Sequence, residues 1–185
     1  MISHYRLRQA ARCITAGGVI AYPTEAVYGL GCNPLNESAA YRLLELKQRD
    51  IDKGLILIAA DYSQLIEFVE PLDEATMEPV LKSWPGPNTW LLPAQEWVPR
   101  WVRGKHTSLA VRVTNHPLVS TLCKMVDHPL ISTSANISQK PPARSPAEVR
   151  RQFGNNIDML LSGPLGGLEN PTPIRDAVTG ATIRS

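Results

Sequence analysis

The chain has 185 residues, of which 43% are hydrophobic, and a formal net charge of +2. This length fits one globular domain with a sizeable core and excludes a large second one, so residues 1–185 are expected to form a single domain. Cys13, Cys32 and Cys123 have neither disulfide-framework nor zinc-ligand spacing, and no apolar run is long enough for a signal peptide or a membrane span. These features predict a soluble, cytoplasmic protein with reduced thiols.

Charge is unevenly distributed along the chain. Residues 100–151 hold nine Lys or Arg against two acidic residues, whereas residues 61–80 hold six acidic residues and no cation. The acidic stretch is typical of a solvated helical surface. The basic stretch admits two interpretations, because cations solubilise any face on which they lie and also form electropositive surfaces for phosphates or RNA.

Hydrophobic periodicity predicts alternating helices and strands in the first third of the chain. A helix over 4–16 ends at two glycines, and a β-prone strand over 19–22 ends at a proline. The glycine-containing segment 24–34 is predicted to be an irregular loop that carries function. A helix capped by Asn36 then runs to about residue 49 and precedes an apolar strand over 55–58.

The rest of the chain continues this pattern and ends in a hairpin. The expected helices cover 61–69, 73–83, 116–126 and a segment opened by Ser145, and the expected strands cover 89–92, 108–113 and 129–132. A W-P-G-P sequence interrupts regular structure, and S-P-A-E at the start of the last helix is a capping box. Segments 174–178 and 181–184, joined at Thr179-Gly180, are predicted to pair. The fold class is therefore α/β, with a twisted, open and mixed sheet flanked by helices.

Polar clusters at the ends of these elements mark the candidate site. The sequence contains no G-x-x-x-x-G-K-[ST] loop, no complete dinucleotide fingerprint, no H-E-x-x-H and no G-x-S-x-G. What remains are segments 23–31, 47–49, 108–112 and 132–138, which lie near element ends, where open α/β sheets bind ligands. Taken alone, the hydroxyl-rich last segment is more typical of a turn than of a site.

Together these segments resemble the YrdC/TsaC family of threonylcarbamoyl-AMP synthases. The shared elements are P-T-E-A-V-Y-G-L-G at 23–31, K-Q-R at 47–49, W-P-G-P at 84–87, S-L-A-V-R at 108–112 and S-A-N at 134–136. They occur in the family's order, and a D-K-G-L-I-L-I-A segment is similar to the short bacterial TsaC form. The resemblance implies the YrdC-like fold, a twisted open sheet curved around a large concave cleft.

The reaction that the resemblance implies joins L-threonine, bicarbonate and ATP into L-threonylcarbamoyladenylate and pyrophosphate. The chain would be an ATP-binding nucleotidyltransferase whose product serves the tRNA modification t6A, through a separate threonylcarbamoyl transferase complex. Mg²⁺ is expected with ATP, but no carboxylate cluster marks a protein-held metal, so its ligands are expected from phosphates and water. Direct binding of tRNA stays open.

Cations of two segments are expected to surround the triphosphate. These are Lys47, Arg49 and Lys53, because adenylyl transfer needs positive charge at the α-phosphate and at the departing pyrophosphate. Their alternative is a simple preference of cations for a helix C-terminus. Arg112 is expected at the threonine or carbamate carboxylate, since a guanidinium offers a bidentate fork, and its alternative is a surface ion pair.

Hydroxyl and amide groups complete the expected site. The nucleotide contacts carried over from the family are Ser108, Ser134 and Asn136, and the candidates for the threonine end are Thr24, Ser132 and Thr172. Of these and the cations, Lys47, Arg49, Ser134 and Asn136 form the expected catalytic set.

Two rival interpretations remain on the sequence. The basic stretch is compatible with a non-catalytic RNA-binding module in tRNA or ribosome maturation, which would show salt-dependent RNA affinity without nucleotide turnover. An unrelated ATP-dependent carbamoyltransferase would share the nucleotide ligands but lack a threonine pocket.

Overall fold

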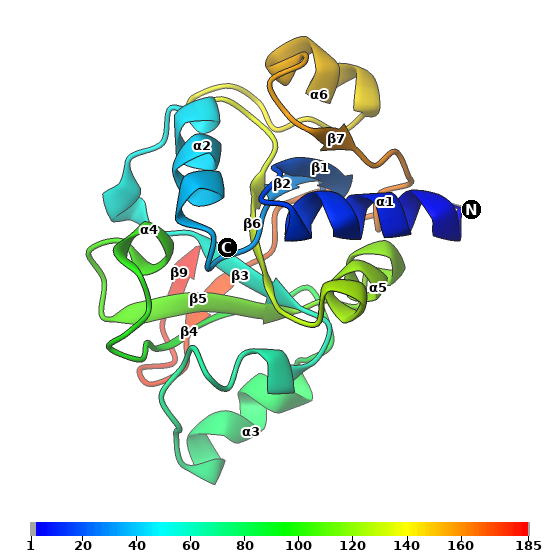
Figure 1. The fold of residues 1–185 in the computed structure, drawn as a ribbon. Coiled ribbons are helices and arrows are strands. Elements are labelled where there is room, and N and C mark those ends of the chain that lie inside the picture. The colour runs from blue at the N-terminus through cyan, green and yellow to red at the C-terminus, as the bar shows by residue number, and fades with distance from the viewer. Residues whose placement is uncertain (1–2, 185) are drawn as a thin grey trace.

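The computed structural model describes residues 3–184, which form one twisted sheet with helices around it (Figure 1). In chain order the elements are α1 (His4–Thr15), β1 (Ile20–Pro23), β2 (Tyr28–Gly31), α2 (Glu37–Lys47), η1 (Ile51–Lys53), β3 (Ile56–Ala59), η2 (Tyr62–Gln64), α3 (Glu74–Lys82), β4 (Thr89–Pro93), α4 (Arg100–Arg103), β5 (Ser108–Val113), α5 (Pro117–Val126), β6 (Leu130–Ser134), α6 (Pro146–Phe153), β7 (Met159–Leu160), β8 (Ile174–Asp176) and β9 (Thr182–Arg184).

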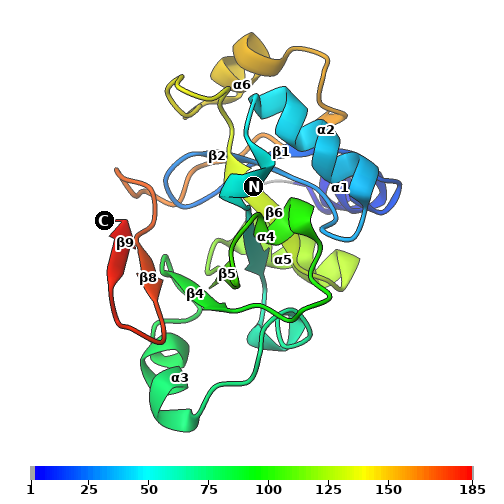
Figure 2. The ribbon, with the colours of Figure 1, turned by 90° about the vertical axis from the view of Figure 1, so that its left-hand side faces the viewer.

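The sheet is mixed, as the sequence predicted. Its strands follow the order β7-β1-β2-β6-β3-β5-β4-β8-β9. The pairs β1–β7, β3–β5 and β4–β8 are parallel, and the remaining neighbours are antiparallel. The C-terminal hairpin β8–β9 therefore forms one edge of the sheet, where Figure 2 shows it beside β4.

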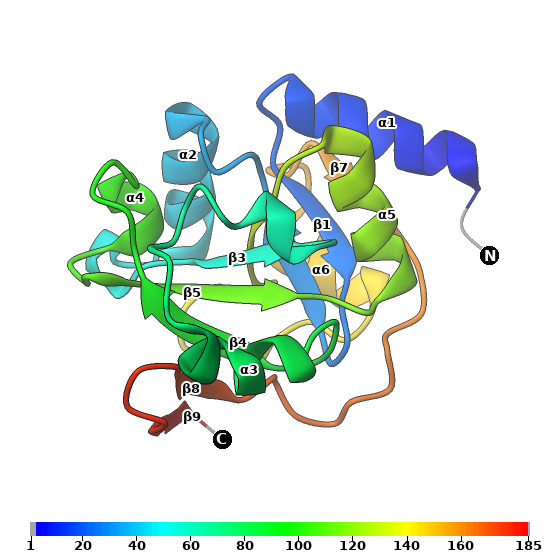
Figure 3. The same ribbon diagram turned by 90° about the horizontal axis from the view of Figure 1, so that it is seen from below.

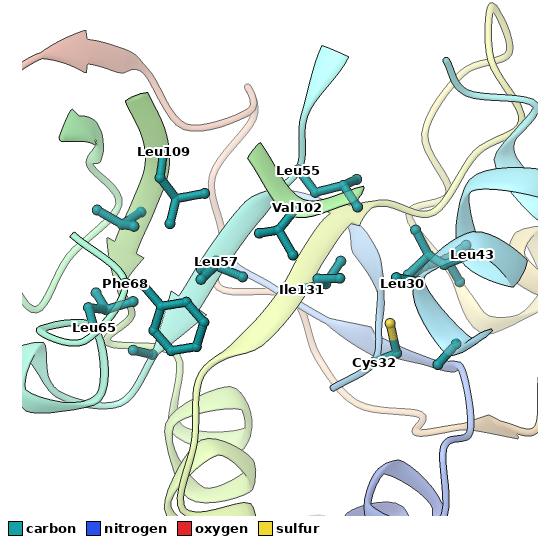
Figure 4. Packing of buried hydrophobic residues seen from close by; sticks show 14 of the residues in the cluster. Leu30, Cys32, Leu43, Leu55, Leu57, Leu65, Phe68, Val102, Leu109 and Ile131 are labelled. Atoms are coloured by element: carbon teal, nitrogen blue, oxygen red, sulfur yellow. The ribbon is translucent and has the colours of Figure 1, made fainter. Parts of the chain in front are cut away.

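The central strands are buried on both faces, because alternate side chains of a strand enter two different cores. In β3, Leu57 packs in the larger cluster and Ile58 in a second cluster with α1 and α5. In β6, Ile131 packs in the larger cluster and Leu130 in the second one. Figure 4 shows the larger cluster, in which Leu57 and Ile131 lie between side chains from distant parts of the chain.

Helices α1 and α5 pack against each other and against one face of the sheet (Figure 3). Ile58 lies on that face and is the register partner of Arg112 in β5, so the two side chains share it. Ile58 belongs to the cluster beneath the two helices, whereas Arg112 lines a pocket. The helices thus cover only part of this face, and the rest of it is available to a ligand.

Side-chain caps begin four of the helices, as their sequences indicate. Asn36 accepts a hydrogen bond from the backbone N–H of Ala39 at 2.9 Å. Ser145 accepts one from Glu148 at 3.3 Å, while the Glu148 carboxylate accepts from the backbone N–H of Arg144, one residue before the expected partner. Such caps satisfy amide groups that have no partner within the helix.

Segment 24–34 is not an irregular loop throughout, because it contains β2. Two glycines in a Tyr-Gly-Leu-Gly sequence weaken the strand signal, and pairing with β1 and β6 supplies what local propensity lacks. The expected helix over 61–69 is also wrong. The Asp61 carboxylate accepts from the N–H of Ser63 and closes a short 3₁₀ turn, after which Val69 bridges to Ala94.

Three short elements were not predicted at all. They are helix α4, the 3₁₀ helix η1 and strand β7, with four, three and two residues, too few for a periodic signal. Within residues 3–184 no helix combines the length and the apolar character that a bilayer crossing requires.

Candidate functional site

The four polar segments converge on a pocket of about 480 Å³. It lies on the part of the sheet face that α1 and α5 leave uncovered, and the C-terminal hairpin forms a further wall. Among the site residues expected from the sequence, those that line it are Thr24, Arg49, Lys53, Ser108, Arg112, Ser132, Ser134, Asn136 and Thr172. Lys47 does not line the pocket.

Strand β5 places three of its residues on the pocket face. Its period of two directs Ser108, Ala110 and Arg112 to the pocket, and Val111 and Val113 into the larger core. An arginine in an otherwise apolar strand therefore has a reason in the fold: its neighbours hold the strand in the core while the guanidinium faces the ligand space.

Arg112 is buried, with only 6% of its surface exposed. Its Nη1 donates a hydrogen bond to Thr172 Oγ1 at 2.8 Å, and its Nη2 lies 3.2 Å from Glu25 Oε2. Its Nε is buried without a partner. The alternative of an ion pair is thus realised, although the pair is buried rather than on the surface, and it leaves part of the guanidinium free to bind an anion.

Thr24, Gly29 and Ser132 form the end of the pocket near Arg112. A Cβ added to Gly29 would lie 3.2 Å from Thr24 Cγ2 and 3.5 Å from Ser132 Oγ, so the missing side chain leaves room there. The Thr24 hydroxyl donates to the Val27 carbonyl at 2.7 Å, which keeps its lone pairs available. This end offers a small cavity with hydroxyl groups beside a guanidinium.

Further cations line the pocket, and no carboxylate among the described lining residues compensates them. Arg49 is held by the Gly54 carbonyl at 2.9 Å, and Arg184 by the Thr172 carbonyl at 2.8 Å. Burial lowers the pKa of Arg49, and the nearby charge of Arg184 lowers it further. Partial desolvation lowers the pKa of Arg184, with a smaller effect from Arg112. No Asp or Glu within residues 3–184 lines the pocket, so the field inside favours anions.

Arg184 was missed by the sequence interpretation. It lies in β9, outside the segments that carry the family motifs, and its side chain reaches the pocket only because the hairpin pairs with β4. The hairpin itself was predicted from the sequence, but its position at the sheet edge was not.

Lys47, which is expected at the triphosphate, lies beneath the described pocket lining. It is only 3% exposed, and its Nζ donates hydrogen bonds to the backbone carbonyls of Ser134 and of Asn136. Burial lowers the pKa of the Lys47 amine to about 7, and Arg49 adds to this effect. Lys47 belongs to the last turn of α2, whose end is buried under the segment that follows β6, so its side chain supports that segment from below.

Ser134 and Asn136 form a connected pair at the pocket wall. The Ser134 hydroxyl donates to Asn136 Oδ1 at 2.6 Å, and Asn136 Nδ2 donates to the carbonyls of Ile137 and Lys140 at 3.0 and 2.8 Å. The Ser134 proton is therefore engaged, and its lone pairs remain for a donor or a cation.

A protein-held metal does not fit the donors of this pocket. Hard divalent cations prefer carboxylate and carbonyl oxygens. The pocket lining has none of the carboxylates, and residues 3–184 contain no cluster of three His, Cys, Asp or Glu side chains suited to a metal.

The fold and the site together define an α/β protein with a cation-lined pocket at an open sheet face. The family model Sua5_yciO_yrdC, described as "Telomere recombination", matches residues 12–185. The chain belongs to this family, and the resemblance seen in the sequence is confirmed.

Relatives with curated names are similar along the whole chain. A protein of Pseudomonas aeruginosa (strain UCBPP-PA14) named threonylcarbamoyl-AMP synthase is 54% identical over 184 residues, which cover 100% of this chain and 99% of that protein. One of the same name from Halorhodospira halophila is 56% identical over 180 residues, 97% of this chain and 94% of that protein.

Solved structures show the same fold. P. abyssi Sua5, solved as a complex with L-threonine, superposes with a TM-score of 0.91 at 34% identity. The match covers 98% of this chain but only 54% of the Sua5 chain. E. coli YciO superposes with a TM-score of 0.87 at 26% identity, over 99% of this chain and 90% of YciO. The expected YrdC-like sheet is therefore confirmed.

Proposed function

We propose that the chain is an L-threonylcarbamoyladenylate synthase, a nucleotidyltransferase that forms threonylcarbamoyl-AMP and pyrophosphate from L-threonine, bicarbonate and ATP. The observation that carries this proposal is a single pocket with two unlike ends. One end joins a buried guanidinium to hydroxyl groups, and the other is lined by cations with no carboxylate among its described residues. The full-length relatives named threonylcarbamoyl-AMP synthase support it.

The chemistry asks the protein for positioning and for positive charge. The threonine amine condenses with bicarbonate to a carbamate, with loss of water. An oxygen of this carbamate attacks the α-phosphorus of ATP, and the bond from that phosphorus to the bridging oxygen breaks as pyrophosphate leaves. We assign Arg49, Lys53 and Arg184 to the phosphates, where they stabilise the charge that shifts to the leaving group. No covalent enzyme intermediate is needed, since both reactants lie in one pocket.

The threonine end is assigned to the groups around Arg112. The N–H groups of Arg112 that face the pocket bind the substrate carboxylate, and the hydroxyls of Thr24 and Ser132 lie beside it. Thr172 fixes Arg112 through the 2.8 Å hydrogen bond. The L-threonine complex of the related Sua5 supports a threonine site in this fold.

Ser108, Ser134 and Asn136 are assigned to the nucleoside side of the pocket. Because the Ser134 proton is used by Asn136, Ser134 accepts a hydrogen bond from a ribose hydroxyl or an adenine amine, or contacts a cation. Mg²⁺ that arrives with ATP is bound by phosphates and water in this proposal.

The product would pass to a threonylcarbamoyl transferase complex that modifies tRNA to t6A. The chain itself needs no RNA for the proposed step. Because the pocket draws on segments from Thr24 to Arg184, we also propose that residues 1–185 act as one domain.

The test is release of pyrophosphate by the purified protein with ATP, L-threonine and bicarbonate. We expect turnover that requires all three substrates and falls by about a hundredfold in Arg49→Ala, since such charge contacts contribute several kcal/mol to the transition state. Arg150→Ala is the matched control, because Arg150 is exposed on α6 and does not line the pocket.

Two outcomes would contradict the proposal. One is the absence of pyrophosphate from the wild-type protein under these conditions. The other is turnover that continues without threonine or with carbamoyl phosphate in place of bicarbonate and threonine, which would favour a different carbamoyltransferase. RNA binding that is the same in the wild type and in Arg49→Ala, with no turnover by either protein, would favour the non-catalytic module.

A further inference from the structure

A buried carboxylate beside Arg112 has no role in the chemistry assigned so far. Glu25 is 4% exposed and does not line the pocket. Its Oε2 lies 3.2 Å from Arg112 Nη2, and its Oε1 accepts a hydrogen bond from Thr114 Oγ1 at 2.5 Å. A buried carboxylate is costly unless it is paired, so its place next to the substrate guanidinium needs an explanation.

Thr114 is itself fixed by the backbone on both sides. Its N–H donates to the Ala59 carbonyl at 3.0 Å, and its Oγ1 accepts from the backbone N–H of His116 at 3.1 Å. Only 1% of Thr114 is exposed. The hydroxyl proton therefore has one partner, the Glu25 carboxylate, and the carboxylate takes its position from the end of β5.

The pair of Glu25 and Thr172 determines the plane of the Arg112 guanidinium. Nη2 faces Glu25 and Nη1 donates to Thr172, so two points on opposite nitrogens define the orientation. Nε keeps no partner. A guanidinium held in this way presents its remaining N–H groups in a fixed direction, which a bidentate contact with a carboxylate requires.

We propose that Glu25 and Thr114 are positioning residues for threonine binding, which act in series to orient Arg112 and do not touch the substrate. The inference rests on the proposed function, because it assumes that Arg112 binds the threonine carboxylate. Under this proposal Glu25 of the P-T-E sequence and Thr114, just after β5, contribute to the affinity for threonine and not to the affinity for ATP.

The first test replaces the Thr114 hydroxyl and keeps the shape of the side chain. Thr114→Val removes the donor to Glu25 and also the acceptor of the His116 N–H, and we expect the KM for threonine to rise about tenfold through the lost bond to Glu25. The KM for ATP should stay within about twofold, because the cations at the phosphates are unaffected. Thr114→Ser restores the hydroxyl and should restore the KM for threonine.

Thr121→Val is the matched control. Its hydroxyl donates to the Pro117 carbonyl within α5, away from the pocket. This substitution makes the same chemical change and should leave both KM values at their wild-type levels.

The second test uses Glu25→Gln. The Thr114 hydroxyl already accepts from the His116 N–H and donates to Glu25, so the amide oxygen that keeps this bond leaves the amide NH₂ facing Arg112, where two donors then meet. We expect a higher KM for threonine here too. In the double variant, Thr114→Val should add little, because both residues act through the same contact.

The outcomes separate this inference from the function on which it rests. If the wild-type protein releases no pyrophosphate, the proposed function fails. If it is active and Thr114→Val leaves the KM for threonine unchanged, or raises both KM values equally, the positioning role is wrong. Additive effects in the double variant would also overturn it. Should Thr114→Val not fold, an unchanged KM for threonine in Glu25→Gln alone decides against the inference.

Discussion

At the scale of single residues, Lys47 lies under the pocket wall and not in the pocket lining. Its position at the end of α2 is the one predicted, yet its amine lies under the segment after β6 and bonds to two backbone carbonyls there. The sequence could not distinguish these roles, because a cation at a helix end is equally suited to a phosphate and to carbonyl groups.

The buried amine of Lys47 makes stability depend on pH. Its pKa is about 7 in the folded protein and 10.5 in an ordinary lysine. Between these values the unfolded chain binds more protons than the folded one, so the free energy of unfolding rises with pH through this window. We expect the wild-type protein to gain on the order of 1 kcal/mol between about pH 7 and about pH 9 relative to Lys47→Met.

Urea unfolding at the two pH values measures this difference. Lys47→Met keeps the length of the side chain and removes the titrating group, so comparison with the wild type isolates Lys47 from other groups. An identical pH dependence in both proteins would show that Lys47 does not titrate in this range.

Gly29 offers a second test at this scale. Gly29→Ala would place a methyl group 3.2 Å from Thr24 and 3.5 Å from Ser132, inside the proposed threonine end. We expect the KM for threonine to rise about tenfold, since a misplaced group in a closely packed pocket costs about 1–3 kcal/mol. The KM for ATP measured on the same samples should not change; an equal rise in both would place the threonine pocket elsewhere.

At the scale of elements, strands and helices with regular periods were predicted well. Strand β5 spans the expected residues 108–113. Alternate side chains along it face the core and the pocket. β2 was missed because Gly29 and Gly31 hide its period, and residues 61–69 were misassigned because Leu65 and Phe68 also suit a helix. The conformation of both segments depends on the strands with which they pair, and a single sequence does not reveal these partners.

The C-terminal hairpin gives the clearest prediction at this scale. Along it Arg184 points to the pocket, whereas Arg175 in β8 lies over the ring of Trp90, 5.9 Å from its centre. We expect Arg184→Ala to raise the KM for ATP about tenfold, as the loss of a partly desolvated charge contact. Arg175→Ala, in the same hairpin, should leave that KM within about twofold.

The hairpin test also has a structural readout. Because β8 pairs with β4 at the edge of the sheet, both variants should keep the same helix and strand content by circular dichroism. An equal rise in the KM for ATP in both variants would mean that the hairpin stabilises the fold and does not contact the nucleotide.

At the scale of the whole molecule, the pocket ties distant segments to one another. Arg112 and Ser134 reach it from β5 and β6 in the middle of the sheet, Arg184 from β9 at one edge, and Thr24 and Arg49 from connecting segments. The sequence indicated that such segments lie at element ends. It could not show that Lys47, two residues from Arg49, is excluded from the space they enclose.

Ligands that bind across these segments should stabilise the folded chain as a unit. A ligand at a hundred times its Kd raises the free energy of unfolding by about 2.7 kcal/mol if it binds only the folded state. We therefore expect ATP and threonine each to shift the urea midpoint upward. In Arg112→Ala the shift with threonine should vanish while that with ATP remains, because only the carboxylate contact is lost. In Arg49→Ala the shift with ATP should vanish while that with threonine remains. If both ligands lost their effect in both variants, the two ends of the pocket would not be separate, and the division of roles between Arg112 and Arg49 would be wrong.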